Sequence, residues 1–465
     1  MHNVICEYEI YRLGGNRMKK ISLILFLCII AFSILRAEDK SVIKLIPVYE
    51  KTFQDTIVDV IFDTATVNIE KAKAMGWKEE AFNEGERAKG EATISYPKVV
   101  MVSRGRELGW YSPEIRSSYY LKEIRFYNKK GKLLNTLEIV TKGDEWVHIS
   151  ANHKYVLISK IPAEYNPEYS GGILYNNEGK RICEINGPTP IAVSDEGYMI
   201  AAYLDWQVPP EPGGSFYIYN PSGKLIKTIK NPDKEKTAPL FAKYSKDGEY
   251  AVLVFKATTF PPTVICLIKK TGKILWKKEF PEFRFSAREE EIDFLSDEGI
   301  IAVFDLVKIM PSRESWKTFI LNVDLQGKLA WKIPLPIRGN MFVKIVGNKK
   351  KVLVTSTNGY LWCINMINGQ MLWNQIEKWG LDERRNWQVP FYVELKIMEN
   401  NFYVIGKQGR NWHSSTLFVF DGENGKLLKK VEYPLEKITF AKCKEGIGLI
   451  NITKRKMYIF KKVQK

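Results

Sequence analysis

The sequence contains few residues of the kinds that hold metal ions, and they are widely spaced. Of its four histidines only His148 and His153 lie within ten residues of each other, and none of its six cysteines forms a Cys-x-x-Cys or Cys-Cys pair. Because zinc sites need ligands at short, regular spacings, no metal site is predicted. The cysteines beyond the N-terminal segment, Cys183, Cys266, Cys363 and Cys443, are interpreted as small buried apolar residues. An oxidising compartment would allow one disulfide, but the spacing selects no pair.

Short catalytic motifs are also absent. The chain has no Gly-x-Ser-x-Gly nucleophile elbow, no phosphate-binding loop and no His-Glu-x-x-His. Carboxylates do gather at Glu289–Glu291, Asp293 and Asp297, but such a charge run is typical of a solvated face, and paired carboxylates matter only at a defined separation. The sequence therefore predicts a protein that is not an enzyme. A hydrolase or lyase acting on a glycan or peptide is kept as an alternative.

Only one apolar run is long enough to suggest targeting, and it lies at the N-terminus. Lys19 and Lys20 precede the apolar run Ile21–Leu35, which is shorter than the ~20 residues of a membrane-spanning helix. This pattern predicts a secretory signal peptide over residues 1–37, with Met18 as the true start. An uncleaved anchor is the alternative, because Leu35 is not small. No transmembrane segment is expected in the mature chain, which is predicted to be periplasmic or secreted.

The charge is basic but dispersed. The whole chain carries +17, and residues 1–37 hold five Lys or Arg and two Glu, so the remainder carries 65 − 51, or +14. No five consecutive residues are basic. Such a charge favours partners with acidic surfaces without indicating a specific nucleic acid. The expected partner is a protein or another envelope component, bound by a monomer.

A short turn recurs along most of the chain. Each copy follows an apolar strand and has glycine followed by lysine, or by glutamine in one copy, as in Tyr127–Leu133. The turn glycines are Gly131, Gly179, Gly223, Gly272, Gly327, Gly369 and Gly425, separated by 48, 44, 49, 55, 42 and 56 residues. Glycine accepts the positive φ that a tight hairpin requires. Periods of ~40 to 50 residues are typical of propeller blades.

A second turn signal precedes several of these hairpins. Ser194–Tyr198, Ser245–Tyr250 and Ser296–Ile300 each lie between apolar segments, and the residues around both kinds of turn alternate with the period of two that strands require. Two hairpins per period make four antiparallel strands. The fold class predicted is all-β, a single β-propeller of four-stranded antiparallel blades.

Two of the repeats resemble those of a known family. Val264–Trp276 and Leu361–Trp373 are similar to the repeat of quinoprotein-like, PQQ-type propellers, in which a tryptophan four residues after the turn glycine packs between blades, and Trp331 after Gly327 is a third instance. The other four turns lack this tryptophan. The chain is closest in character to non-catalytic propellers of the outer-membrane-assembly type, although Cys28 follows Leu27 and so has no lipoprotein motif.

The same resemblance has an enzymatic branch, the PQQ-dependent dehydrogenases. Membership there would imply bound PQQ, a calcium ion held by acidic and amide side chains, a catalytic aspartate and, in some members, a disulfide between adjacent cysteines. This chain has no adjacent cysteines, and no motif in it identifies residues that correspond to those ligands. No cofactor is therefore predicted, and the dehydrogenase remains an alternative.

Blade number depends on how the ends of the chain meet. Three more strands follow the last glycine turn, and a strand at Val42–Tyr49 would complete their blade and remove exposed edges. Eight blades are therefore predicted, with seven as the alternative. A short helix is expected over Asn68–Gly90, before a strand at Ile94–Val102. The predicted domains are a signal peptide (1–37), an N-terminal extension with the closing strand and helix (38–93) and the propeller (94–465).

The binding site is predicted on one face of the propeller. In a four-stranded blade the tight first-to-second and third-to-fourth connections share one face, and the other connections share the opposite face. The latter are long here and rich in aromatic residues and arginine, which are enriched at interface hot spots. The predicted binding residues are Trp110, Arg116, Trp206, Arg313, Trp316, Arg384, Arg385, Trp387, Arg410 and Trp412. For any one of them, packing over a blade edge or a solvated ion pair is the alternative.

Overall fold

The protein is described from a computed structural model. The structure describes residues 44–107, 119–138, 144–161, 170–203, 214–231, 237–257, 263–281, 283–285, 292–295, 299–306, 317–338, 343–347, 350–356, 360–376, 393–398, 400–408, 414–441 and 447–463. Apart from the first residue of the first strand, the elements below belong to one compact unit, Leu45–Val463.

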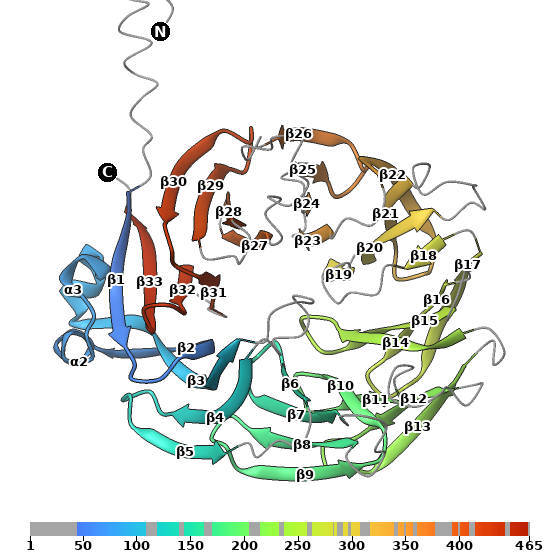
Figure 1. Cartoon of the computed structure of the whole chain (residues 1–465), viewed down its shortest axis with the longest axis horizontal. Helices are drawn as coiled ribbons and strands as arrows, with labels where there is room; N and C mark the ends of the chain where they lie inside the picture. The colour runs from blue at the N-terminus through green and yellow to red at the C-terminus, as the bar shows by residue number, and fades with distance from the viewer. Residues whose placement is uncertain are drawn as a thin grey trace, which may run out of the picture. The chain divides into compact units, whose positions relative to one another are not determined.

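The described strands form eight antiparallel sheets, the blades of a propeller (Figure 1). The first blade is β2 (Ile57–Asn68), β3 (Glu91–Glu107), β4 (Tyr119–Tyr127) and β5 (Leu133–Glu138). The second is β6 (Asp144–Ile149), β7 (Tyr155–Ile161), β8 (Gly171–Asn176) and β9 (Arg181–Asn186). The third is β10 (Thr189–Val193), β11 (Met199–Ala202), β12 (Ser215–Tyr219) and β13 (Leu225–Lys230). The fourth is β14 (Thr237–Tyr244), β15 (Tyr250–Ala257), β16 (Thr263–Lys269) and β17 (Ile274–Phe280).

The remaining blades complete the ring. The fifth is β18 (Phe283–Phe285), β19 (Ile292–Leu295), β20 (Gly299–Leu306), β21 (Lys317–Val323) and β22 (Leu329–Arg338), with β18 and β19 both paired to β20. The sixth is β23 (Val343–Gly347), β24 (Lys351–Ser356), β25 (Tyr360–Asn365) and β26 (Met371–Ile376). The seventh is β27 (Val393–Met398), β28 (Asn401–Gln408), β29 (Ser414–Asp421) and β30 (Leu427–Tyr433). The eighth is β31 (Ile438–Phe440), β32 (Ile447–Asn451), β33 (Lys456–Val463) and β1 (Lys44–Thr52).

The eighth blade joins the two ends of the chain. Its strand order is β1-β33-β32-β31, so the first strand of the sequence is the outermost strand of the last blade (Figure 1). The strand expected at Val42–Tyr49 is thus β1, with somewhat later bounds. The all-β class and the eight blades predicted from the sequence are confirmed.

The segment between β2 and β3 differs from the single helix expected over Asn68–Gly90. It contains α2 (Ile69–Ala74), the 3-10 helix η2 (Glu79–Ala81) and α3 (Glu84–Lys89). Gly76 has a φ of +97° and interrupts the helix, whereas Asn83 and Glu86 form a capping box that starts α3. β2 was not expected, and it makes Ile57–Asn68 the innermost strand of the first blade, so strands of the propeller begin before residue 94.

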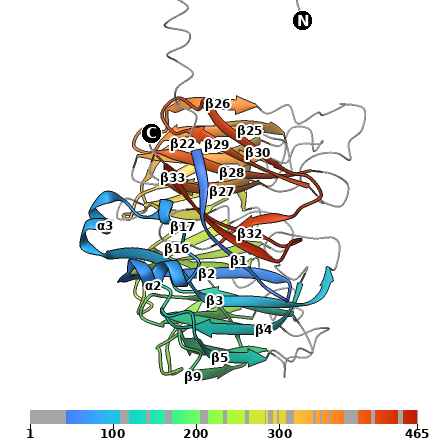
Figure 2. The same ribbon diagram turned by 90° about the vertical axis from the view of Figure 1, so that its left-hand side faces the viewer.

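The helical segment also covers the outer edge of the closing strand. The backbone N–H of Lys78 donates to the carbonyl oxygen of Val48 at 2.9 Å, and the rings of Tyr49 and Trp77 lie 5.4 Å apart. Figure 2 shows α2 and α3 at the left of the view. Because an uncovered edge strand can pair with other chains, this contact protects the place where the ring closes.

The core lies between neighbouring blades. One buried cluster combines Ile200 and Phe216 of the third blade with Leu253 and Cys266 of the fourth. Another combines the closing strand, the helical segment and the first and eighth blades, and it includes Val48 and Trp77. The blades therefore stabilise one another face to face, as stacked sheets do.

Candidate functional site

The ten residues predicted to bind a partner lie outside the described residues. In sequence they fall in the connections β3–β4, β11–β12, β20–β21 and β28–β29 and in the connection between β26 and β27. According to the sheet order, each of these connections joins either the second strand of a blade to the third or one blade to the next. Connections of both kinds share one face of a propeller. This face is called the loop face below, and the opposite one, with the glycine turns, the turn face.

One corner of the loop face is described, at the eighth blade. It consists of residues 53–56, 434–437 and 452–455, which connect β1 to β2, β30 to β31 and β32 to β33. The backbone N–H of Phe53 donates to the carbonyl oxygen of Arg455 at 2.9 Å, and the guanidinium of Arg455 donates to the carbonyl oxygen of Gln54. The three connections therefore form one hydrogen-bonded surface, called the blade-eight corner.

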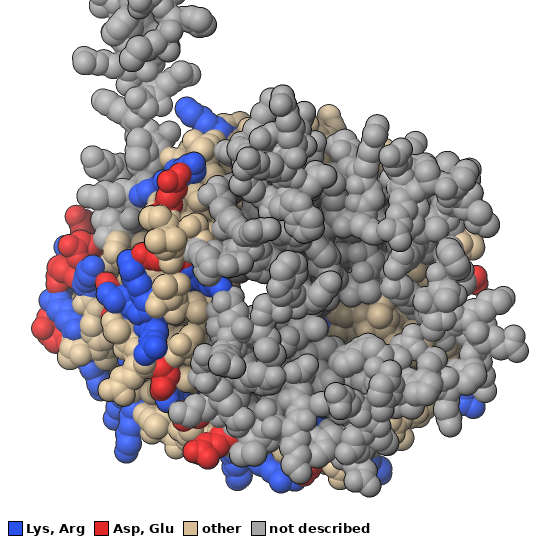
Figure 3. Space-filling view, viewed as in Figure 1, with Lys and Arg blue, Asp and Glu red and all other residues tan. Residues whose placement is uncertain are grey.

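Hydrogen bonds and ion pairs fix this corner further. The N–H of Lys437 donates to Oγ1 of Thr453 at 3.0 Å. Glu436 accepts a hydrogen bond from the side chain of Asn451 and pairs with Lys454, whose pKa is raised by that bond and by the nearby negative charge. In Figure 3 the described surface at the left of the view shows Lys and Arg side chains interspersed with Asp, Glu and uncharged residues.

Two strained residues lie in the blade-eight corner. Among the residues that the structure describes, only His153, Leu435 and Arg455 have a positive φ without being glycine, with Leu435 at +59° and Arg455 at +55°. Such a conformation is a genuine outlier for a bulky side chain and points to a function or a strong structural constraint. Arg455 has such a constraint in its bonds to Phe53 and Gln54.

The turn face, in contrast, satisfies its own polar groups. In the turn of the second blade, the N–H of Gly179 donates to the carbonyl oxygen of Asn176 at 3.0 Å, and Oδ1 of Asn176 accepts from the N–H groups of Glu178 and Lys180. All seven turn glycines have a positive φ, between 73° and 84°. The predicted role of glycine with a preceding Asn or Asp is confirmed in six of these turns, and in the turn of Gly272 Lys269 replaces the Asn or Asp.

The first hairpins of neighbouring blades are also joined on the turn face. The N–H of Asn152 donates to Oδ1 of Asp195 at 2.7 Å, and a Cβ on Gly248 would lie 2.9 Å from the nitrogen of Asp195. Burial raises the pKa of Asp195, although hydrogen bonds from Asn152 and Ala151 oppose the shift. Asp195 thus connects three blades.

Each turn glycine from the second blade onward contacts the outer strand of the blade before it. A Cβ added to Gly327, Gly369 or Gly425 would lie within 3.0 Å of the indole of a tryptophan. The tryptophans are Trp276, Trp331 and Trp373, each four residues after the glycine of its own blade. The indole N–H of Trp331 also donates to the carbonyl oxygen of Met366 at 2.8 Å. The predicted packing of tryptophan between blades is confirmed.

The fold is an eight-bladed β-propeller in which one docking position recurs from blade to blade. In the blades without tryptophan the same position is occupied by other residues: Asn135 contacts Gly179, Cys183 contacts Gly223 and Lys227 contacts Gly272. The docking geometry therefore recurs from the first blade to the seventh even where its sequence signature is missing. A Cβ added to Gly131 would meet no atom within 4 Å, and the blade before it is the closing one.

Comparison with known proteins finds similarity in fold alone. No protein-family model matches the sequence, and no curated protein matches it. Among solved structures, BamB from Moraxella catarrhalis is 8% identical with a TM-score of 0.48, over 90% of this chain and 100% of that one. The hydrazine synthase of Kuenenia stuttgartiensis is 10% identical with a TM-score of 0.42, over 70% and 92%. The computationally designed Ika8 protein is 10% identical with a TM-score of 0.46, over 90% and 99%.

Within the described ranges, no three His, Cys, Asp or Glu side chains lie close enough together to hold a metal ion. Cys266 and Cys363 are buried and free, as interpreted from the sequence, and burial raises the pKa of each thiol to about 12. Cys183 is free and half-buried, and Cys443 lies outside the described residues.

None of the described helices has the length and apolar character to span a membrane.

The blade-eight corner has almost no signature in the sequence. The turn at Ile452–Lys456 has no glycine, and the turn at Tyr433–Glu436 has leucine where glycine or asparagine would be expected after proline. The only sequence signal was Pro434, which is common at the second position of such turns.

Proposed function

We propose that this chain is an exported, non-catalytic propeller that binds a protein or another envelope component through its loop face. The aromatic and arginine residues named above would make the contacts. Both residue types combine large contact areas with directed hydrogen bonds, and they dominate the energetics of interfaces.

The difference between the two faces carries this proposal. On the turn face, the described hairpins are short and bond to themselves and to their neighbours, as Asn176 and Asp195 do. Five connections of the loop face contain all ten predicted binding residues, and four of these five have 10 to 16 residues, whereas the glycine turns have four or five. Since long connections carry most binding functions on rigid scaffolds, a partner is expected there.

Two features of the sequence support the compartment and the type of partner. The pattern of Lys19, Lys20 and Ile21–Leu35 favours export. The charge of +14 beyond residue 37 favours a partner with an acidic surface. The proposed location is the periplasm or the exterior of the cell.

The test is capture of partners from an envelope extract with purified chains that begin at residue 38. A loop-face variant carries Arg384→Ala, Arg385→Ala and Trp387→Ala. The matched control carries Lys224→Ala, Lys273→Ala and Ile367→Ala, which also removes two cations and one exposed apolar side chain, but from the turn face. The loop-face variant is expected to lose proteins that wild type and control both retain.

Equal capture by the three chains, with all three folded, would contradict the role of that loop. Incubation with PQQ and Ca²⁺ tests the enzymatic alternative independently. A stoichiometric quinone absorbance together with dye-linked oxidation of an alcohol would replace the proposed function with a dehydrogenase.

A further inference from the structure

Leu435 occupies a backbone conformation that its side chain disfavours. The N–H of Glu436 donates to the carbonyl oxygen of Tyr433 at 3.2 Å, which closes a four-residue turn with Pro434 at its second position and Leu435 at its third. With a φ of +59°, Leu435 takes the place that glycine or asparagine fills in such turns. The N–H of Leu435 donates to Oγ of Ser414 at 3.0 Å and holds the turn in place.

The side chain of Leu435 is not buried, so packing does not offset this strain. It is 76% exposed, one of the most exposed large apolar side chains among the described residues. A leucine that packs against the core can offset an unfavourable φ, but this one does not pack. An exposed leucine that weakens the folded state is the kind of outlier from which a binding role is inferred.

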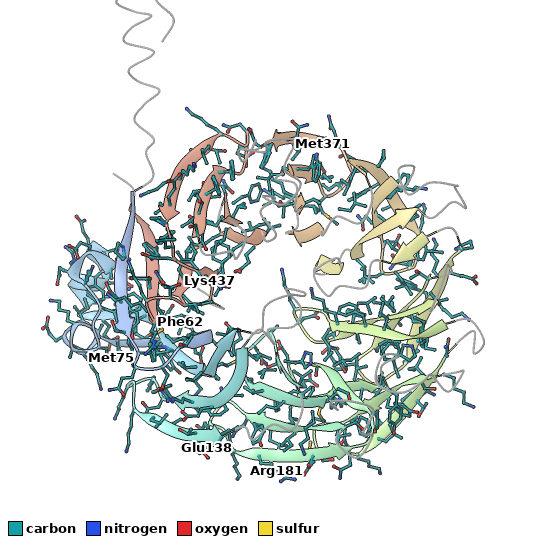
Figure 4. All side chains as sticks on the ribbon, viewed as in Figure 1. Phe62, Met75, Glu138, Arg181, Met371 and Lys437 are labelled. Atoms are coloured by element: carbon teal, nitrogen blue, oxygen red, sulfur yellow. The ribbon has the colours of Figure 1, made fainter. Side chains whose placement is uncertain are left out.

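Cations lie in the connections beside this leucine. Lys437 follows it within two residues, and its backbone N–H donates to Oγ1 of Thr453, while Lys454 pairs with Glu436. The three connections of the blade-eight corner contain three cations and two carboxylates, Asp55 and Glu436. Figure 4 labels Lys437 beside the inner strands of the eighth blade. The corner therefore offers an apolar tip beside a border with more cations than carboxylates.

The chain connects this corner to the predicted binding residues. Ser414, which bonds to Leu435, is the first residue of β29 and directly follows residues 409–413, which include Arg410 and Trp412. The turn of Leu435 is therefore attached to the end of one of the connections assigned to partner binding.

We propose that Leu435 anchors a protein partner, and this inference rests on the proposed function of the loop face. The partner would have an apolar pocket bordered by carboxylates, so that the leucine enters the pocket while Lys437, Lys454 and Arg455 face the acidic border. Burying an exposed leucine in a pocket provides affinity, and complementary charges orient the approach.

The experiment separates strain from binding with Leu435→Gly. Glycine accepts the positive φ, so this variant is expected to melt at a higher temperature than wild type while binding the captured partner about tenfold more weakly. Leu435→Asn, which also tolerates the turn, is expected to bind equally weakly. Ile367→Ala, at a similarly exposed apolar residue on the turn face, is the matched control and is expected to bind as wild type does.

A photo-crosslinking amino acid at position 435 identifies the occupant. Crosslinks to a different protein, absent when the probe is placed at position 367, support the proposal. Crosslinks only to lipid, or only to a second copy of this chain, overturn it.

The outcomes distinguish this inference from the proposed function. Wild-type affinity in Leu435→Gly, with loss of binding in the Arg384, Arg385 and Trp387 variant, overturns the anchor and leaves the proposed function standing. Failure of the wild-type chain to retain any partner that the loop-face variant loses contradicts the proposed function itself.

Discussion

The indole of Trp331 lies directly against Gly369 of the next blade. A Cβ on Gly369 would lie 2.9 Å from two atoms of the ring, and the indole N–H donates to the carbonyl oxygen of Met366. The glycine therefore has two functions, since it accepts a φ of +75° and leaves space for the tryptophan. One residue type thus both turns the chain and joins two blades.

Gly369→Ala is expected to destabilise the protein more than Gly131→Ala. Both glycines have nearly the same φ, +75° and +73°, so the backbone strain of about 1–2 kcal/mol is shared. Only Gly369 faces a ring, and displacing it adds about 1–3 kcal/mol. Urea unfolding of the two variants measures the difference. Equal free energies of unfolding would show that the contact with Trp331 does not constrain the turn.

Removal of β1 is expected to open the ring. A chain that begins at residue 53 lacks Val48 and Tyr49, which are 0% and 4% exposed, and leaves the edge of β33 unpaired. We expect a loss of about 5 kcal/mol or more and a tendency to aggregate. Thermal unfolding and size-exclusion chromatography compare it with a chain that begins at residue 41. An added peptide of residues 41–56 should restore the melting temperature, and an unchanged melting temperature without the peptide would contradict the closing role of β1.

Asp195→Asn is expected to remove the pH dependence that Asp195 contributes to stability. Because burial raises the pKa of Asp195 in the folded state, the folded chain binds its proton more tightly than the unfolded chain. Stability therefore falls as pH rises from the unfolded value of about 3.9 through the folded value, and is then level. Asparagine keeps an oxygen for the N–H of Asn152 without the charge.

Urea unfolding between about pH 3 and pH 7 tests this. The free energy of unfolding of wild type minus that of Asp195→Asn should decline as pH rises, and an increase would show that the sign of the shift is wrong. Asp195→Ala, which also removes the hydrogen-bond acceptor, should cost a further 1–2 kcal/mol or so at every pH.

Cys266 and Cys363 are expected to resist alkylation in the folded protein. Their exposed fractions are 1% and 0%, and burial raises the pKa of each thiol to about 12, so almost no reactive thiolate forms at pH 8. Mass spectrometry after iodoacetamide treatment should find both modified only in guanidinium chloride. Half-buried Cys183 is the internal comparison, and rapid native labelling of Cys266 or Cys363 would contradict their burial.

The repeated hairpins could be predicted because their determinants are local. A glycine such as Gly272, preceded by a polar turn and followed by alternating apolar residues, specifies a hairpin through its own φ and its neighbours. The spacing of those hairpins then indicated blades. Other features left no such signal: Cys183 and Lys227 occupy the docking position of the tryptophans without resembling them.

The candidate site likewise has one part that the sequence predicts and one part that it does not. The sequence shows directly which connections are rich in aromatic residues and arginine, so the connections that form the loop face could be predicted from it. Leu435 could not, because only its positive φ, its 76% exposure and its bond to Ser414 distinguish it from any other leucine.

The sequence by itself determined the strand repeat, the blade length and the tight turns, because each depends on residues adjacent in the chain. Only the tertiary structure decided which residues fill the docking position, how Tyr49 meets Trp77 where the ring closes, and that Leu435 carries strain without burial. These depend on contacts between residues that lie more than 20 positions apart in the chain. Such contacts are selected by the packing of whole blades, which no local pattern encodes.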